Sequence, residues 1–207
     1  MALTPANVQR AVKHLRAADP VLANVIRQVG PFTLRPDRDR FGMLVRSIIS
    51  QQISGKAARS IRARLTEVVA PEKISAEALL RLTAAELRSA GLSLQKAGYL
   101  HDLAEKVQAG AVNLRQIARR DDDAVIAELV QVKGIGVWTA QMFLMFSLGR
   151  LDVFPHADLG IRSALRNLYQ LDDLPDKARS HEIAEPWRPY ATVASWYCWR
   201  SLELKPG

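Results

Sequence analysis

Two glycines separated by a single residue, Gly134 and Gly136, stand between two apolar stretches in the second half of the chain. The stretches AVIAELV and VWTAQMFLMF lack the apolar–polar alternation that is typical of strands, so both read as helices. Glycine allows positive φ angles and lets the backbone approach another molecule closely. The pattern therefore predicts two helices joined by a tight turn without room for side chains, with the second helix starting near Val137.

The start of that second helix is a predicted anion site. The first backbone N–H groups of a helix have no partner within the helix, and the helix dipole adds a partial positive charge there. A Gly-X-Gly pattern alone is a weak indication, but this one occurs in a chain of 207 residues with a formal net charge of +8. So large a basic excess favours a polyanion partner over solubility alone, and a DNA phosphate fits the site.

Most other segments also read as helices, and no alternating strand pattern persists. Side chains that accept hydrogen bonds from the first turn precede several of these helices. These cap signals are Thr4-Pro5, Asp19-Pro20, the Thr83–Glu86 capping box, Ser93 and Asp121–Asp123. The three aspartates at 121–123 resemble a metal-binding run, but the helical stretch that follows them favours capping.

Composition excludes several classes of protein. No apolar run is long enough to cross a membrane, and the first residues lack a signal-peptide core. The single cysteine, Cys198, excludes an internal disulfide and a cysteine-ligated iron–sulfur cluster. Four scattered histidines offer no zinc spacing. We therefore expect a cytoplasmic protein with no membrane partner.

The glycine turn and the residues after it resemble the helix-hairpin-helix DNA glycosylases, in particular the 3-methyladenine DNA glycosylase II branch, which removes alkylated bases. The matching residues are Gly134–Gly136, Trp138–Ala140, Asp152–Pro155 and Asp158-Leu159, and the resemblance extends over Phe41–Ala58, Gly91–Ala104 and Trp187–Trp196.

This resemblance implies an all-α fold of two helical lobes, with the helix-hairpin-helix motif at the cleft between them. A central lobe would span about residues 41–150, and the second lobe would combine about 1–40 with 151–207. Together the lobes would form one glycosylase domain. Some relatives add an N-terminal β domain, which the residues before Phe41 are too few to form.

The resemblance places the catalytic aspartate of the family at Asp158. Cleavage of an N-glycosidic bond leaves positive charge on the sugar, which a carboxylate stabilises while it orients or deprotonates the attacking water. Asp158 also precedes an apparent helix, Leu159–Tyr169, so it is equally a predicted N-cap; the two roles are compatible because N–H donors favour the ionised carboxylate. Relatives often carry a second acid where Ala157 stands, and they treat the equivalent of Asp152 as structural.

Trp138 occupies the position where relatives that also cut the DNA backbone carry a lysine that forms a Schiff base. Tryptophan cannot form one, so we expect a monofunctional enzyme that leaves an abasic site. An aromatic face would also attract a positively charged alkylated purine, by roughly 0.5–2 kcal/mol. Trp196 and Tyr197 match other pocket aromatics of the family, although core packing is an equally good interpretation. Met142 replaces an aromatic residue of some relatives in the predicted base pocket.

The paired glutamines Gln51 and Gln52 end a predicted helix over Phe41–Ser54. In the family this junction supplies the side chain that fills the gap left by the flipped nucleotide, and Gln52 is the aligned position. The alternative is that the glutamines only cap the helix. The resemblance completes the predicted DNA-contacting set with Lys133, Gly134, Gly136 and Thr139.

The family hairpin also binds a monovalent cation, Na⁺ or K⁺, through backbone carbonyls. These carbonyls align with Val130, Val132 and Ile135. No other cofactor is expected. The predicted partner is double-stranded DNA that contains alkylated bases of the 3-methyladenine and 7-methylguanine type, and the predicted state is a monomer.

Two alternative functions remain at this point. A non-catalytic hairpin module that holds DNA for a partner explains the glycine turn and the charge, but not Asp158 together with Trp138, Trp196 and Tyr197. The other alternative is a glycosylase for oxidised or mismatched bases, with or without lyase activity. Trp138 argues against it, and so does the lack of cysteines for the iron–sulfur cluster that some relatives carry.

Overall fold

A computed structural model of the chain describes residues 2–204. Within this range the chain forms helices and no strand; the only β-type pairing is an isolated bridge between Ala2 and Arg150. The all-α prediction is therefore confirmed. The chain divides into two compact units, which we call unit 1 (Met1–Pro36 with Leu144–Gly207) and unit 2 (Asp37–Phe143).

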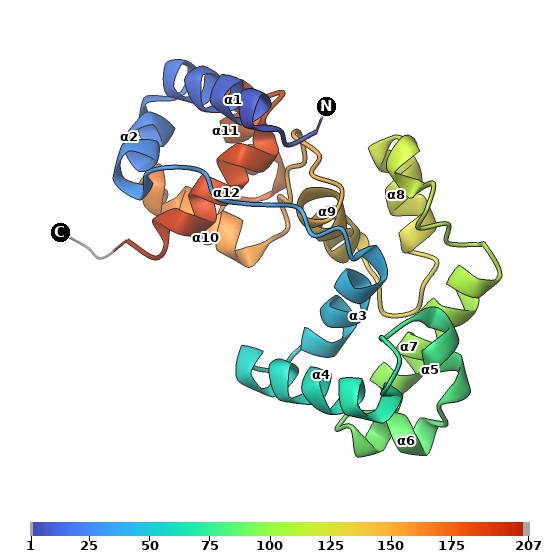
Figure 1. Cartoon of the computed structure of the whole chain (residues 1–207). Coiled ribbons are helices and arrows are strands. Elements are labelled where there is room, and N and C mark those ends of the chain that lie inside the picture. The colour runs from blue at the N-terminus through green and yellow to red at the C-terminus, as the bar shows by residue number, and fades with distance from the viewer. Residues whose placement is uncertain (1, 205–207) are drawn as a thin grey trace. The chain divides into compact units, whose positions relative to one another are not determined.

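Unit 1 combines the two ends of the chain. Its N-terminal helices α1 (Pro5–Ala18) and α2 (Pro20–Val29) pack against C-terminal helices, drawn in blue and in orange to red in Figure 1. The C-terminal helices are α10 (Leu159–Leu168), α11 (Lys177–Ala184) and α12 (Ala191–Ser201). Side chains from both ends form one core, which includes Leu15, Leu22, Ile26, Leu165, Trp187 and Val193.

A buried carboxylate ties these two ends together. One oxygen of Asp19 caps α2 and accepts the backbone N–H groups of Val21 and Leu22, at 2.9 and 3.0 Å. The other oxygen accepts the indole N–H of Trp187 at 2.8 Å and the hydroxyl of Tyr169. Burial and the neighbouring carboxylate raise the pKa of Tyr169, which keeps its hydroxyl protonated as a donor. Because every donor is paired, the buried charge fixes the N-terminal helices on the C-terminal ones.

Unit 2 is built around α7 (Leu94–Gln108), which packs against the helices that precede it. Those helices are α3 (Arg40–Ser50), α5 (Ala76–Arg81) and α6 (Ala84–Ser89), while α4 (Gly55–Val69) packs against α3. After α7 the chain forms α8 (Asp122–Leu129) and then enters α9 (Val137–Phe146).

Helix α3 is shorter than the sequence predicts. It ends at Ser50 instead of Ser54, because Gln51 leaves the helical region with ψ near 129° and Gln52 takes a positive φ of 55°. The residues 51–53 therefore form a separate turn between α3 and α4, which is capped by Ser54.

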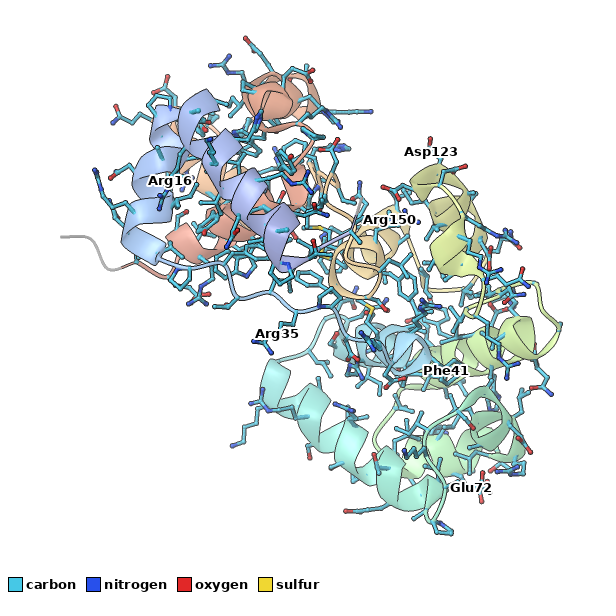
Figure 2. All side chains as sticks on the ribbon, turned by 45° about the horizontal axis from the view of Figure 1, so that its top comes forward. Arg16, Arg35, Phe41, Glu72, Asp123 and Arg150 are labelled. Atoms are coloured by element: carbon cyan, nitrogen blue, oxygen red, sulfur yellow. The ribbon has the colours of Figure 1, made fainter. Side chains whose placement is uncertain are left out.

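The predicted helix caps are confirmed. Side chains of Thr4, Asp19, Ser93 and Asp121 accept first-turn N–H groups, and Thr83 and Glu86 form the capping box. Asp123 lies at the outer end of α8 (Figure 2), and no group of three or more metal-ligating side chains occurs within residues 2–204. None of the helices in that range combines the length and apolar character needed to cross a bilayer.

We expect Asp19→Ala to lower the free energy of unfolding by about 3–5 kcal/mol, because it removes an N-cap and leaves the buried donors of Trp187 and Tyr169 without an acceptor. Urea unfolding followed by circular dichroism measures this loss. The exposed Asp172→Ala is the control and should change stability by less than about 0.5 kcal/mol. A similar small change for Asp19→Ala would contradict the role given to this carboxylate.

Candidate functional site

The predicted helix–turn–helix lies in unit 2. Helix α8 ends at Leu129, and α9 begins at Val137, as the sequence predicts. Between them the N–H of Val132 donates to the carbonyl of Leu129 at 3.1 Å, and that of Ile135 to the carbonyl of Val132 at 3.0 Å. Ile135 is buried, while the flanking residues Lys133 and Gly136 are exposed. The apolar side chain of Ile135 therefore anchors the turn, while Lys133 and Gly136 face solvent.

The two glycines of this turn have different requirements. Gly134 has a φ of +82°, and a Cβ on it would lie 2.2 Å from the ring of Tyr99. Gly136 has no positive φ, and a Cβ on it would meet no atom within 4 Å. The prediction of a turn without room for side chains is correct for Gly134 and wrong for Gly136. The fold requires the first glycine, whereas the second leaves open space at the start of α9.

Asp102 on α7 holds the turn from below. Its Oδ2 accepts the backbone N–H of Lys133 at 2.8 Å, and its Oδ1 accepts the ammonium of Lys106 at 2.7 Å. Burial alone would raise the pKa of Asp102, but these hydrogen bonds outweigh it and the pKa lies below its ordinary value. The ammonium of Lys133 is 3.8 Å from the same carboxylate, and its side chain is 75% exposed. A fixed anion thus stabilises the turn and leaves the lysine largely in solvent.

The glutamine pair splits into one internal and one exposed residue. The side-chain amide of Gln51 donates to the carbonyl of Gly134 at 2.7 Å, so this glutamine contacts the hairpin turn within the protein. Gln51 is also the C-cap residue of α3, which fits the capping alternative. Gln52 is exposed. Its gap-filling role stays a prediction, and its exposure is compatible with that role.

The first turn of α9 exposes large apolar surface. Trp138 is 46% exposed and Val137 53%, which is unusual for side chains of this size. Met142 and Thr139, further along the same helix, are 6% and 5% exposed. Of the residues predicted on α9, Trp138 is therefore the one that offers a face to a ligand in this structure. The roles of Met142 and Thr139 stay predictions.

Asp158 lies in unit 1 and caps α10, as predicted. Its Oδ1 accepts the backbone N–H of Ile161 at 2.8 Å and the indole N–H of Trp199, on α12, at 2.9 Å. Gly160 allows this close packing, since a Cβ there would lie 3.0 Å from both Oδ1 of Asp158 and Cδ1 of Trp199. Two donors on one oxygen fix the direction of the carboxylate.

Trp199 is the functional candidate that sequence reasoning missed. It lies one helical turn after Trp196, so its position as the last residue of ASWYCW was the available signal. Its ring stacks on Phe146, with centroids 5.7 Å apart, in addition to its bond to Asp158. We infer that Trp199 holds the candidate catalytic carboxylate.

The two aromatics that were predicted for the base pocket are buried in unit 1. Trp196 is 8% exposed and packs edge-on against Phe32, with centroids 4.8 Å apart. Tyr197 is 1% exposed and donates its hydroxyl to the carbonyl of Gly30 at 3.0 Å. These contacts fit the core-packing alternative, and the pocket role of both residues stays a prediction.

Asp152 and His156 are two other polar residues that lie near Asp158 in the sequence. Asp152 accepts the guanidinium of Arg188 at 2.8 Å and the N–H of Ala191 at 3.2 Å, as expected for a structural acid. Burial, followed by the charges of His181 and Lys177, lowers the pKa of His156. The imidazole is therefore neutral at pH 7 and is a poor general acid there.

Comparison with known proteins shows similarity to base excision DNA repair proteins. Residues 45–189 match the family described as HhH-GPD superfamily base excision DNA repair protein. DNA-3-methyladenine glycosylase 1 of Schizosaccharomyces pombe is 32% identical over 205 residues, which cover 96% of this chain and 89% of that protein. The Bacillus subtilis protein YfjP is 32% identical over 173 residues, 81% of this chain but only 60% of that protein.

A solved structure of 3-methyladenine DNA glycosylase from Schizosaccharomyces pombe, in complex with abasic DNA, is also similar. It superposes with a TM-score of 0.83 at 32% identity, over 94% of this chain and 97% of that one.

The unequal glycines give a testable contrast. Gly134→Ala should destabilise the protein by at least about 1–2 kcal/mol, because alanine is strained at positive φ and its methyl group would collide with Tyr99. Gly136→Ala should change the free energy of unfolding by less than about 0.5 kcal/mol. It should weaken binding to an undamaged duplex several-fold, because the added methyl group would occupy the open space that receives a phosphate. Phosphate contacts do not depend on sequence, so an undamaged duplex reports this loss. Urea unfolding and fluorescence anisotropy measure the two effects. If Gly136→Ala bound the duplex as tightly as wild type, the turn would not receive a phosphate at Gly136.

Proposed function

The chain belongs to the HhH-GPD superfamily of base excision DNA repair proteins, and on this premise we propose that it is a DNA glycosylase for alkylated bases. It flips the damaged nucleotide out of duplex DNA and hydrolyses its N-glycosidic bond. The observation that supports this proposal most is the carboxylate of Asp158, held by the N–H groups of Ile161 and Trp199.

The carboxylate of Asp158 supplies the charge that the reaction requires. As the base departs, positive charge develops on C1′ and the ring oxygen of the sugar, and an ionised carboxylate stabilises it. The same group can orient the attacking water or accept its proton. The N–H groups of Ile161 and Trp199 both donate to Oδ1 of Asp158, and these hydrogen bonds fix the direction of the carboxylate. Water and the protein's own side chains suffice, and no cofactor is required.

The substrate class follows from the leaving group. A purine alkylated at N3 or N7 carries a formal positive charge and leaves without prior protonation. The exposed face of Trp138 attracts such a cation by roughly 0.5–2 kcal/mol when the contact is desolvated. A neutral lesion would need a general acid, and His156 is a poor one at neutral pH. We therefore propose bases of the 3-methyladenine and 7-methylguanine type.

The hairpin of unit 2 anchors the DNA. The turn from Lys133 to Gly136 receives a backbone phosphate, which positions the duplex without reading its sequence. The carbonyls of Val130, Val132 and Ile135 would hold a monovalent cation, which would supply positive charge for the phosphate. Gln52 fills the gap in the duplex once the nucleotide has left the stack. We propose that the two units act as one monomeric domain in this reaction.

Release of free bases from duplexes that contain single lesions tests the proposal directly. Wild-type protein should release 3-methyladenine and 7-methylguanine faster than hypoxanthine, and should leave 8-oxoguanine in place. Binding without release of any base would favour the non-catalytic hairpin module instead.

Asp158→Asn should fold and bind DNA but excise at least about 100-fold more slowly, because asparagine keeps a capping oxygen and removes the negative charge. Trp199→Phe keeps a ring and loses one charge-assisted hydrogen bond, so we expect a loss of roughly tenfold. Single-turnover rates on a 7-methylguanine duplex measure both. Asp152→Asn removes a nearby structural acid and is the control, for which the rate should remain close to that of wild type. A wild-type rate in Asp158→Asn would rule out its assigned role.

The product should be an abasic site in an intact strand. Trp138 stands where a lyase would carry its lysine, and the thiol of Cys198 is buried with a raised pKa, so neither is a covalent nucleophile. Borohydride added during turnover should therefore trap no protein–DNA adduct, and strand cleavage should appear only after alkali. Trp138→Lys is the informative variant, since any adduct gained there would show that the position faces the sugar. An adduct in wild type that is lost in Lys133→Ala would show that Lys133 forms the Schiff base, and would contradict the monofunctional proposal.

A further inference from the structure

One face of α7 carries three side chains that each hold one of two turns. Lys96, Tyr99 and Asp102 follow one another at intervals of three residues, a spacing that places them on one side of a helix. Tyr99 and Asp102 contact the hairpin turn at Gly134 and Lys133. Lys96 contacts the other turn, which connects α3 to α4. A single helix therefore supports both of the turns that are proposed to meet DNA.

Lys96 adds two short hydrogen bonds to a segment whose own backbone hydrogen bonds are long. The backbone bonds from the N–H of Gln51 to Ile48 and from that of Ile53 to Ser50 are long, at 3.4 and 3.5 Å. The ammonium of Lys96 donates to the carbonyls of Ile49 and Gln51, at 2.7 and 2.6 Å. A cation at the C-terminus of α3 also interacts favourably with the helix dipole. Lys96 thus provides the end of α3 with two hydrogen bonds from another helix.

Burial at this place has an electrostatic cost. Lys96 is only partly exposed, and its partial burial lowers the pKa of the ammonium from its ordinary value. The two short bonds to carbonyls compensate for that cost. The side chain of Lys133, in contrast, is 75% exposed.

The supported turn in turn contacts the hairpin. The amide of Gln51 donates to the carbonyl of Gly134 at 2.7 Å, which links the two turns directly. The next residue, Gln52, has a φ of 55°, a conformation that is unfavourable for a non-glycine residue. Such a conformation persists only where neighbouring contacts impose it, and Lys96 and Gln51 provide them.

We infer that Lys96 is a positioning residue for base flipping, because it keeps the Gln51–Gln52 turn in register with the phosphate-binding hairpin. This inference rests on the proposed function and on Gln52 as the gap-filling residue. Lys96 itself does not touch DNA in this scheme. Its loss should impair the insertion of Gln52 and leave the hairpin, which Tyr99 and Asp102 hold independently, able to bind a duplex.

The test compares binding with insertion. The first probe is an undamaged duplex, whose affinity is measured by anisotropy. The second places 2-aminopurine opposite a tetrahydrofuran abasic analogue, so that its fluorescence reports the environment of the orphaned base. Lys96→Met should keep the affinity for the undamaged duplex within about twofold. It should lose most of the fluorescence response and excise roughly tenfold more slowly, the loss expected for one charge-assisted interaction.

Three variants serve as controls. Lys96→Arg retains a charged donor and should restore most of the fluorescence response. Lys73→Met removes an exposed lysine of unit 2 and should behave as wild type in both assays. Gln51→Leu cuts the link to Gly134 while leaving α7 intact, and it should reproduce the insertion defect even if Lys96→Met folds poorly.

A double-mutant cycle with Gln52→Ala decides whether Lys96 acts through Gln52. If it does, Lys96→Met should add little to the defect of Gln52→Ala, because the two changes remove the same step. Full additivity, or an equal loss on the undamaged duplex, would overturn the inference in favour of a general structural role. An unchanged fluorescence response in Lys96→Met would overturn it as well. If wild type released no base, the proposed function would fail, while the fluorescence assay would still judge Lys96.

Discussion

Carboxylates that accept a backbone N–H together with a side-chain donor from a distant segment organise this protein. An all-helical chain leaves the first N–H groups of each helix without partners, and a short acidic side chain can satisfy them. Asp19 caps α2 and binds Trp187 and Tyr169, and Asp158 caps α10 and binds Trp199. Asp102 has the reverse arrangement, because it accepts the backbone N–H of the distant Lys133 and the ammonium of Lys106 on its own helix. In each case one carboxylate joins a contact within its own segment to a contact with a distant one.

The local half of these interactions could be predicted from the sequence, and the distant half could not. Cap residues, the start of α9 and the N-cap at Asp158 follow from patterns within a few residues, and the structure confirms them. The partner of Gln51, the bond from Trp199 to Asp158 and the open space at Gly136 depend on packing between segments far apart in the chain. Periodicity carries no information about such contacts, so Trp199 was missed although its neighbours Trp196 and Tyr197 were named.

The structure also separates residues that the fold needs from residues that it leaves exposed. Gly134, Gln51 and Asp102 are engaged within unit 2. Gly136, Gln52 and Trp138 are exposed there, in a chain whose net charge is +8. Exposed tryptophan and strained glutamine are costly for stability, and such costs are commonly retained where a ligand is bound. The distribution thus supports the proposed DNA interface independently of the resemblance to other glycosylases.

Asp158 accepts two hydrogen bonds, from Ile161 and Trp199, and this has a consequence for how the position can change in evolution. An aspartate there contributes an N-cap that is worth about 1 kcal/mol, whether or not any chemistry occurs. A descendant that had lost its activity would still be selected to keep an acceptor at that place for folding. The presence of the acid in a related sequence therefore reports foldability first. Retention of the charged form, in contrast to asparagine or serine, is the better marker that the ancestral reaction has been preserved.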